Sequence, residues 1–211
     1  MARYLSIHPD DPQPRLLAQV ADALREGGVI ALPTDSCYAF GCCLGEKNSI
    51  ERIRRLRGVD ERHHLTLMCR DLSEIAQFAH VDNAQYRLLK AVTPGSYVFI
   101  LEGTKELPRR LLHPKRKTIG LRVPDHRAAR AILDELGEPL LTSTLLLPGD
   151  ESPPTEGWEI QDRLGDALDV ILDGGHCGIV PTTVVDLTRQ PPELVRAGRG
   201  PLMPFGFDRF G

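Results

Sequence analysis

The chain has 211 residues, of which 41% are hydrophobic and 26% are charged, a composition typical of a globular protein with one well-packed core. No apolar stretch approaches the roughly 20 residues of a membrane-spanning helix, and the first ten residues lack the apolar core of a secretory leader. We therefore expect a cytoplasmic protein without membrane contact.

Helical signals recur along the chain. Pro12 or Pro14 can open a first helix, because proline is tolerated in the first turn. Asp71 and Glu74 have the spacing of a capping box. Apolar spacing and cap residues predict helices at residues 14–26, 48–57, 71–79, 82–92, 126–136 and 161–164.

Apolar runs of strand character lie between these helices. We predict strands at residues 29–32, 65–69, 97–101, 118–123, 140–147, 169–172, 183–187 and 194–196. Several strands follow one another with only turns between them, so strict alternation of strand and helix is absent. This pattern predicts a mixed α/β fold of the α+β class, with a twisted sheet of parallel and antiparallel strands and flanking helices. We expect a single domain at residues 4–200 and a loose C-terminal tail at 201–211.

A group of polar side chains follows the strand predicted at residues 29–32. Pro33 ends strand pairing by removing a backbone donor, and Thr34, Asp35, Ser36 and Tyr38 come next. Polar side chains at the end of a buried strand often form a small-molecule site on a rigid frame. The same residues fit a strand end at which Thr and Ser cap their own backbone. The two interpretations remain open at this point.

The basic residues are unevenly distributed. The chain has a formal net charge of −3 at pH 7, yet the segment 105–122 holds seven basic residues and one acid. Such a run is usually a solvated face, but in an otherwise acidic chain it predicts a phosphate-bearing partner. The candidate RNA-binding patch, here called the basic loop, consists of Lys105, Arg109, Arg110, Lys115, Arg116 and Lys117.

The five cysteines show no C-x-x-C spacing, and their odd number argues against a closed disulfide framework. We expect them to be small buried apolar residues, and we predict no metal site. The chain also lacks the G-x-G-x-x-G and Walker A signatures of common nucleotide-binding folds.

Five short motifs occur in an order typical of one protein family. They resemble the P-T-[DE]-T-x-Y, KxR, RxP, S-T-V-V-D-L and R-x-G motifs of the YrdC/YciO family, and stand here as Pro33–Tyr38, Arg55–Arg57, Arg122–Pro124, Thr182–Leu187 and Arg196–Gly198. Segments 66–71 and 104–110 resemble the YciO branch of that family. The resemblance extends over about residues 5 to 200.

This resemblance implies a YrdC-like fold with a concave basic cavity. It also implies a relation to threonylcarbamoyl-AMP synthases, nucleotidyltransferases that join L-threonine, bicarbonate and ATP into threonylcarbamoyl-AMP for tRNA modification and release pyrophosphate. Family members are described as double-stranded RNA binders as well. ATP with Mg²⁺ is therefore the expected substrate pair, and double-stranded RNA or tRNA is the expected partner.

The resemblance also implies roles for individual residues. The nucleotide and its phosphates would be bound by Arg55, Arg57, Arg122, Thr144, Thr182 and Arg196. The amino-acid end of the cavity would be bordered by Thr34, Ser36 and Tyr38. No general base or nucleophile is assigned, because the synthases rely mainly on positioning and charge neutralisation.

Helix geometry separates the two arginines of the KxR-like motif. On an ideal helix of ~3.6 residues per turn, Arg57 falls on the apolar side with Ile53 and Leu56, whereas Arg55 lies almost opposite. Either the helix ends before Gly58, or Arg57 is drawn inward to a fixed acceptor. A structural salt bridge is the alternative explanation.

Two positions depart from the synthase pattern. Arg55 replaces the lysine of KxR, and Leu146 replaces the asparagine of S-x-N, while Thr144 retains the hydroxyl. The synthases also have a basic residue just before the next strand, and His63 or His64 corresponds to it here. Because leucine offers no side-chain hydrogen bonds, two functions stay open: a divergent synthase, or a non-catalytic RNA-binding protein. A plain α/β domain with surface arginines is the third interpretation.

Overall fold

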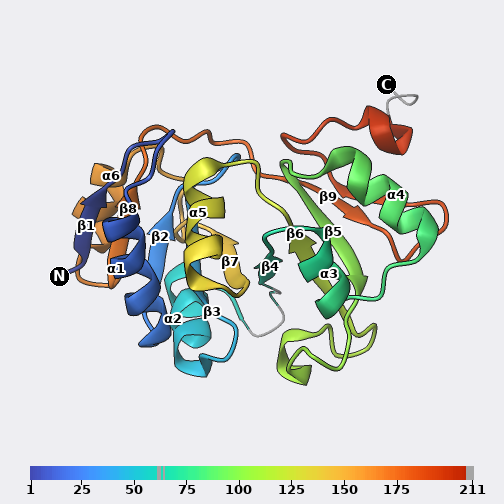
Figure 1. Ribbon diagram of the computed structural model, residues 1–211, viewed down its shortest axis with the longest axis horizontal. Helices are drawn as coiled ribbons and strands as arrows, with labels where there is room; N and C mark the ends of the chain where they lie inside the picture. Colours follow the sequence, from blue (N-terminus) through green and yellow to red (C-terminus); the bar gives the residue numbers. More distant parts are fainter. Residues whose placement is uncertain (61–62, 64, 208–211) are drawn as a thin grey trace.

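The computed structural model describes residues 1–60, 63 and 65–207. One mixed sheet runs through the molecule in the order β1–β8–β2–β3–β7–β4–β6–β5–β9–β10 (Figure 1). Its strands are β1 (Arg3–Ser6), β2 (Ile30–Leu32), β3 (Ala39–Cys43), β4 (Thr66–Met68), β5 (Tyr97–Glu102), β6 (Thr118–Arg122), β7 (Leu140–Thr144), β8 (Val170–Asp173), β9 (Thr183–Asp186) and β10 (Glu193–Arg196).

Helices flank the sheet along its length. They are α1 (Pro14–Arg25), α2 (Lys47–Arg57), α3 (Leu72–Phe78), α4 (Asn83–Val92), α5 (Arg127–Leu136) and α6 (Gly157–Leu164), with short 3-10 turns η1 (Arg109–Leu111) and η2 (Met203–Phe205). β8 runs parallel to β1 and β2, whereas β3 pairs antiparallel with β2 and β7. The predicted α+β fold with a mixed sheet is therefore confirmed. Within the described ranges, no helix has both the length and the apolar character required to cross a bilayer.

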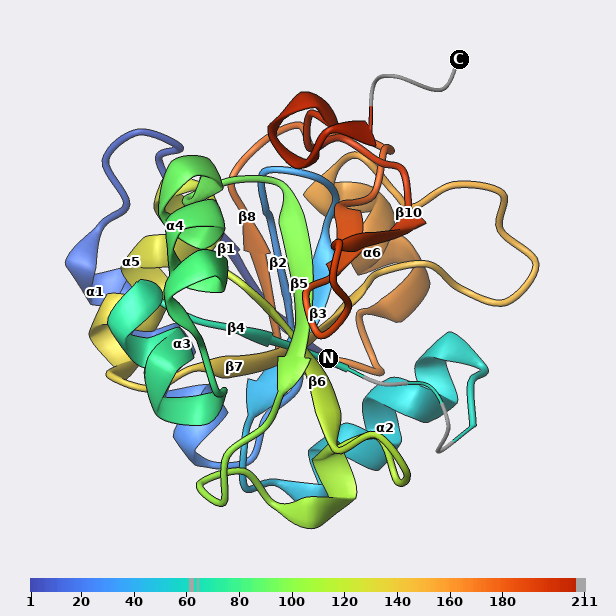
Figure 2. The same ribbon diagram turned by 90° about the vertical axis from the view of Figure 1, so that its right-hand side faces the viewer.

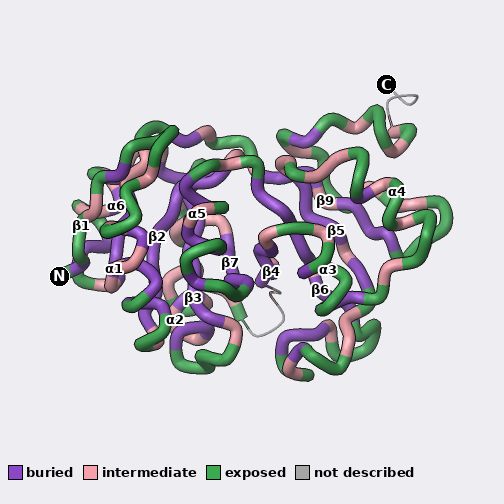
Figure 3. The backbone as a smooth tube through the Cα atoms, viewed as in Figure 1, coloured by how far each residue is buried: buried purple, intermediate pink, exposed green. Residues whose placement is uncertain are grey.

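The half of the sheet around β2 and β8 is covered on both faces (Figure 2). Successive strand residues point to opposite faces, and the two faces belong to different hydrophobic clusters. Ile30 and Leu172 pack with residues of α1 and α5, while Ala31 and Ile171 belong to the cluster that includes α2 and α6. Figure 3 shows these strands as buried and the outer sides of the helices as exposed.

The half of the sheet around β5 and β6 is covered differently. Helices α3 and α4 share a cluster with the alternate strand residues Phe99, Leu121 and Val185. The residues between these point to the other face, and two of them, Val98 and Val184, line a cavity. The functional candidates thus lie on the face of β4, β6, β5 and β9 that is turned away from α3 and α4.

Two strands and one helix start differ from the sequence-based expectation. Strand β3 was not predicted, because its sequence Ala-Phe-Gly-Cys-Cys contains a central glycine and few β-branched residues. It is nonetheless fully buried between β2 and β7. The short edge strand β1 was also missed. Helix α6 begins at Gly157, not 161, because Glu156 and Glu159 form a capping box at this earlier position.

The segment 201–207 is packed, which corrects the expectation of a loose tail there. The Tyr97 hydroxyl donates to the carbonyl oxygen of Pro201 at 2.8 Å. The Phe205 ring lies 5.6 Å from that of Tyr97 in an edge-on arrangement and 5.8 Å from the stacked ring of Phe207. An irregular segment anchored by isolated aromatic residues has no periodic signal in the sequence. Residues 208–211 lie outside the described part of the chain.

The aromatic anchor of this segment can be tested by Phe205→Ala. We expect the free energy of unfolding to fall by about 2 kcal/mol, below the ~3–5 kcal/mol typical of a fully buried phenylalanine, because Phe205 is half-buried. Urea unfolding followed by circular dichroism measures this loss. An unchanged unfolding free energy would show that the segment is not part of the folded unit.

Candidate functional site

The turn between β2 and β3 is held by its own polar groups. The Thr34 hydroxyl donates to the carbonyl oxygen of Cys37 at 2.7 Å and accepts from the backbone amides of Ser36 and Cys37 at 3.2 and 3.3 Å. The capped-strand-end interpretation is therefore correct for Thr34. The turn also lines the cavity, so the two interpretations are compatible.

The cavity has a volume of about 220 Å³. Its lining brings together most of the residues singled out from the sequence: Thr34, Ser36, Tyr38, Arg57, Arg122, Thr144, Thr182 and Arg196. These side chains come from the β2–β3 turn, the end of α2, the strands β6, β7 and β10, and the residue that precedes β9. His63 lines the cavity as well, while His64 lies outside the described residues.

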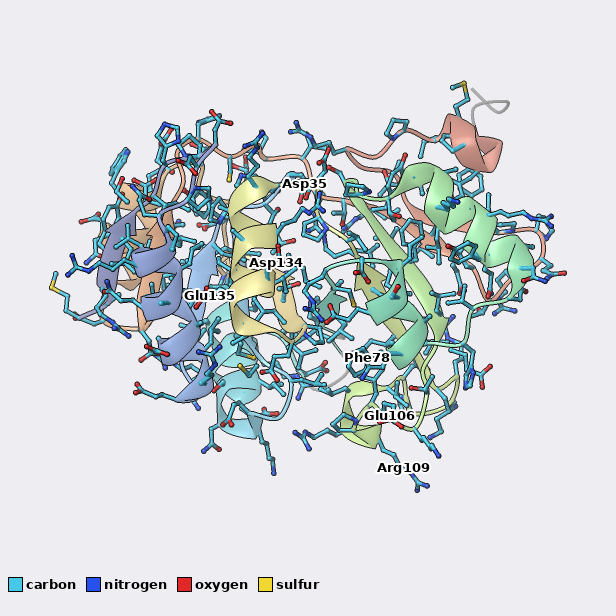
Figure 4. The ribbon with its side chains drawn as sticks, viewed as in Figure 1. Asp35, Phe78, Glu106, Arg109, Asp134 and Glu135 are labelled. Carbon is cyan, nitrogen blue, oxygen red and sulfur yellow. The ribbon has the colours of Figure 1, made fainter. Side chains whose placement is uncertain are left out.

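Arg55 and the basic loop lie elsewhere. Arg55 is exposed and does not line the cavity, because it projects from the side of α2 opposite to the buried Ile53, as the helix geometry predicted. The basic loop joins β5 to β6. Figure 4 shows its residue Arg109 at the opposite end of the molecule from Asp35, which belongs to the cavity turn.

The cavity floor is built by one row of strand residues. Thr66 on β4 is in register with Gly120 on β6 and Thr142 on β7, and Gly120 is in register with Ile100 on β5. A Cβ atom at Gly120 would lie only 2.9 Å from Cγ1 of Val98. The missing side chain at Gly120 therefore keeps the floor open. The strand pairing shows which residues form this row. In the sequence, the alternation of Thr142 and Thr144 is a signal that could have indicated the β7 part of it.

Arg122 and Asp35 form a buried ion pair beneath the turn. Nη2 of Arg122 bonds to Oδ1 of Asp35, and the two side chains are only 7% and 8% exposed. The Ser96 hydroxyl donates to Oδ2 of Asp35 at 2.9 Å. Burial lowers the pKa of Arg122, and the negative charge of Asp35 opposes that shift. Among the described residues, Nε of Arg122 is buried without a hydrogen-bond partner.

Arg57 is drawn inward to a fixed acceptor, as one of the two sequence-based alternatives predicted. Helix α2 continues to Arg57, and Gly58 caps it in the left-handed region at φ 63°. Nη1 of Arg57 donates to the carbonyl oxygen of Leu146 at 2.6 Å. The acceptor is a backbone oxygen, so this contact survives the replacement of asparagine by leucine at position 146. Burial lowers the pKa of Arg57, and the charge of Arg196 lowers it further.

Arg196 is hydrogen-bonded to Thr182, the residue that precedes β9. Its Nε and Nη2 donate to the carbonyl oxygen of Thr182 at 3.1 and 2.9 Å, and Nη2 also reaches the Thr182 hydroxyl at 3.1 Å. The amide of Gly198 donates to the Thr183 hydroxyl at 3.0 Å, and a Cβ atom at Gly198 would lie 2.6 Å from the carbonyl carbon of Thr182. This close approach explains why the R-x-G motif ends in glycine.

Tyr38 connects the turn to β8. Its hydroxyl donates to the carbonyl oxygen of Gly175 at 2.8 Å and to Oδ1 of Asp173 at 3.3 Å, and burial raises its pKa. All five cysteines are free and buried, as expected, and burial raises the pKa of the Cys177 thiol to about 12. Within the described ranges, no three His, Cys, Asp or Glu side chains gather closely enough to hold a metal ion.

A twisted mixed sheet with arginine and hydroxyl side chains lining a cavity on one face defines the class of protein. The chain belongs to the Sua5/YciO/YrdC family, because the family model described as "Telomere recombination" matches residues 22–198. This confirms the family indicated by the five motifs.

Relatives of known name and structure place the chain within this family. It is 53% identical to YciO of Escherichia coli over 205 residues, which are 97% of this chain and 100% of that protein. The crystal structure of E. coli YciO matches with a TM-score of 0.93 over the same shares of the two chains. The threonylcarbamoyl-AMP synthase of Bos taurus is 33% identical over 181 residues, 82% of this chain and 63% of the synthase.

A more distant structural neighbour shares the fold. Pyrococcus abyssi Sua5, solved in complex with L-threonine, matches with a TM-score of 0.85 at 24% identity, over 92% of this chain and 57% of that one. The chain thus has the YrdC-family fold and is related to threonylcarbamoyl-AMP synthases.

The buried ion pair can be tested by Asp35→Ala. Removing the carboxylate leaves Arg122 buried and unpaired, and we expect a loss of about 3–5 kcal/mol in the free energy of unfolding. Urea unfolding measures the loss. The matched control is Asp22→Ala, which removes an exposed ion pair with Arg25 and should cost at most about 1 kcal/mol.

A double variant separates the cost of leaving Arg122 charged and unpaired from the cost of lost packing at Asp35. Arg122→Met combined with Asp35→Ala removes both charges, and most of the lost stability should return. If Asp35→Ala cost no more than Asp22→Ala, the ion pair would not be a structural requirement of the turn.

Proposed function

We propose that the cavity binds ATP and threonine and that the protein is a divergent threonylcarbamoyl-AMP synthase acting in tRNA modification. The observation that carries this proposal is the charge of the lining. Three arginines line the cavity, and among the described residues that line it there is no carboxylate.

The arginines are not equivalent. Arg122 is neutralised by Asp35, whereas Arg57 and Arg196 have no carboxylate within ion-pair distance among the described residues. Guanidinium groups stay charged in proteins, and two such groups held in one site repel each other. An anionic ligand would compensate both charges, and phosphate groups match the geometry of arginine well.

Hydroxyl groups line the rest of the cavity. Ser36, Thr142, Ser143 and Thr144 can each donate or accept a hydrogen bond without a shifted pKa, which suits the amine, carboxylate and hydroxyl of an amino acid. The relation to synthases, one of whose family members was solved with L-threonine, supports threonine as that amino acid.

The described residues that line the cavity do not form a Mg²⁺ site of their own, so the ion would enter only as part of the substrate. Mg²⁺ prefers carboxylate and phosphate oxygens, and the described lining offers arginines and hydroxyls instead. We therefore assign the ion to the phosphates of ATP, which would bring it into the cavity. The protein's own contribution is to orient the phosphates and neutralise the charge that develops on the leaving pyrophosphate.

The synthase proposal is tested by incubating purified protein with ATP, L-threonine and bicarbonate. Pyrophosphate release is expected, and Arg57→Ala should reduce it at least about 100-fold, because it removes a positioned donor to the phosphates. Coupled detection of pyrophosphate gives the rate. Arg130→Ala, an exposed arginine of α5, is the matched control and should keep the full rate.

Omission of threonine or of bicarbonate should each stop pyrophosphate release. A rate that does not depend on threonine would indicate simple ATP hydrolysis. No release above that of heat-denatured protein would contradict the synthase proposal.

RNA binding by the basic loop is the second candidate function, and the architecture of the loop favours it. Leu107, Leu111 and Leu112 are buried and anchor the loop, while all six of its basic residues are exposed. A loop that is anchored by buried leucines and presents cations outward suits a phosphate backbone. In this role the protein would bind double-stranded RNA or tRNA without catalysis, as the alternative to the synthase.

The residues best suited to test this are Arg109 and Lys115. Arg116 is less suitable because its Nη1 pairs with the buried Asp186 at 3.1 Å, and Lys117 holds a left-handed conformation at φ 55°. Arg109→Gln and Lys115→Gln should weaken RNA binding and reduce the salt slope by about one for each residue.

Fluorescence anisotropy with a double-stranded RNA and a tRNA at several salt concentrations measures this slope. Arg87→Gln, an exposed arginine on α4, is the control and should leave the slope unchanged. An equal slope in all variants would exclude the basic loop as the RNA site.

A further inference from the structure

The guanidinium of Arg199 lies close to the β2–β3 turn that lines the cavity, although no motif includes Arg199 and the residue does not itself line the cavity. The position that a Cβ atom at Gly178 would take lies 3.1 Å from Nη1 of Arg199 and 3.0 Å from the carbonyl oxygen of Ser36. Ser36 and its neighbour Cys37 line the cavity. The guanidinium therefore lies over the loop glycine beside the β2–β3 turn.

The backbone around Arg199 is rigid. Its amide donates to the carbonyl oxygen of Pro181 at 2.8 Å, directly beside Thr182. A Cβ atom at Gly200 would lie 2.8 Å from the carbonyl oxygen of Ser96, and the flanking Gly198 is equally confined. The main chain thus holds this segment in place, and the side chain of Arg199 is exposed.

The charge of Arg199 acts on the cavity side. Its positive charge lowers the pKa of both Cys37 and Cys177, in opposition to the larger effect of burial. Glu156, an acid whose charge raises the pKa of Cys177, is engaged by His176 at 2.8 Å. Among the described residues, Arg199 has no ion-pair partner within 4.0 Å.

Arg199 thus adds a third arginine without an ion-pair partner among the described residues, beside the turn that borders the cavity of Arg57 and Arg196. The enclosed volume of about 220 Å³ is smaller than the roughly 300–1,000 Å³ typical of small-molecule sites. A nucleotide held by Arg57 and Arg196 would therefore extend beyond the enclosed volume, and Arg199 lies beside the β2–β3 turn that borders this volume.

We propose that Arg199 binds a polyphosphate chain that extends from the cavity past Arg196, and so favours nucleoside triphosphates over monophosphates. This inference rests on the proposed function, because it assumes that the ligand of the cavity is a nucleotide. Arg199 would bind a phosphate group in either case, because both a nucleotide and an RNA backbone can present one at this place.

Calorimetric titration with ATP, AMP, pyrophosphate and a tRNA distinguishes these sources. Arg199→Ala should weaken ATP and pyrophosphate binding about tenfold, as expected for one charge-assisted hydrogen bond, and AMP binding less than twofold. Arg199→Lys should recover part of the loss. Arg130→Ala is the control for removal of an exposed arginine, and an unchanged melting temperature of Arg199→Ala would show that the variant is folded.

The possible outcomes separate the two proposals. If the unaltered protein binds neither ATP nor pyrophosphate, the nucleotide site itself is wrong. If it binds both and Arg199→Ala binds them equally well, only the role of Arg199 is wrong. Weakened tRNA binding with unchanged ATP binding would also overturn the inference and assign Arg199 to an RNA surface.

Discussion

The buried ion pair between Asp35 and Arg122 is the interaction on which the cavity depends. It joins the β2–β3 turn to β6, on the other half of the sheet, and Ser96 extends the contact towards β5. An ion pair of this kind contributes little net stability, but the loss of one partner is costly. The pair therefore fixes where the turn lies, and the turn carries Thr34, Ser36 and Tyr38 to one wall of the cavity.

The neutralised pair also determines which arginines of the cavity carry uncompensated charge. Because Asp35 compensates Arg122, the remaining positive charge belongs to Arg57 and Arg196, which are held by backbone carbonyl oxygens of Leu146 and Thr182. Neutral acceptors orient a guanidinium and leave its charge available. The protein keeps cations close together at a cost in repulsion, and an anionic ligand accounts for that arrangement better than stability does.

The sequence predicted the fold class and all three described arginines that line the cavity, but not the way in which the site is assembled. Arg57 was recognisable because an arginine on the apolar side of a helix needs an acceptor, yet only the structure identifies that acceptor as the Leu146 carbonyl oxygen. Gly120 and Thr66 were missed because strand register depends on long-range pairing. The packed segment at 201–207 escaped notice because its aromatic anchors follow no period.

The most direct test of the account is a crystal structure of the protein with a non-hydrolysable ATP analogue and L-threonine. We predict phosphate density against Arg57 and Arg196, with the amino acid among the hydroxyl groups of the turn and of β7. Phosphate density on the basic loop, with the cavity filled only by water, would contradict the account.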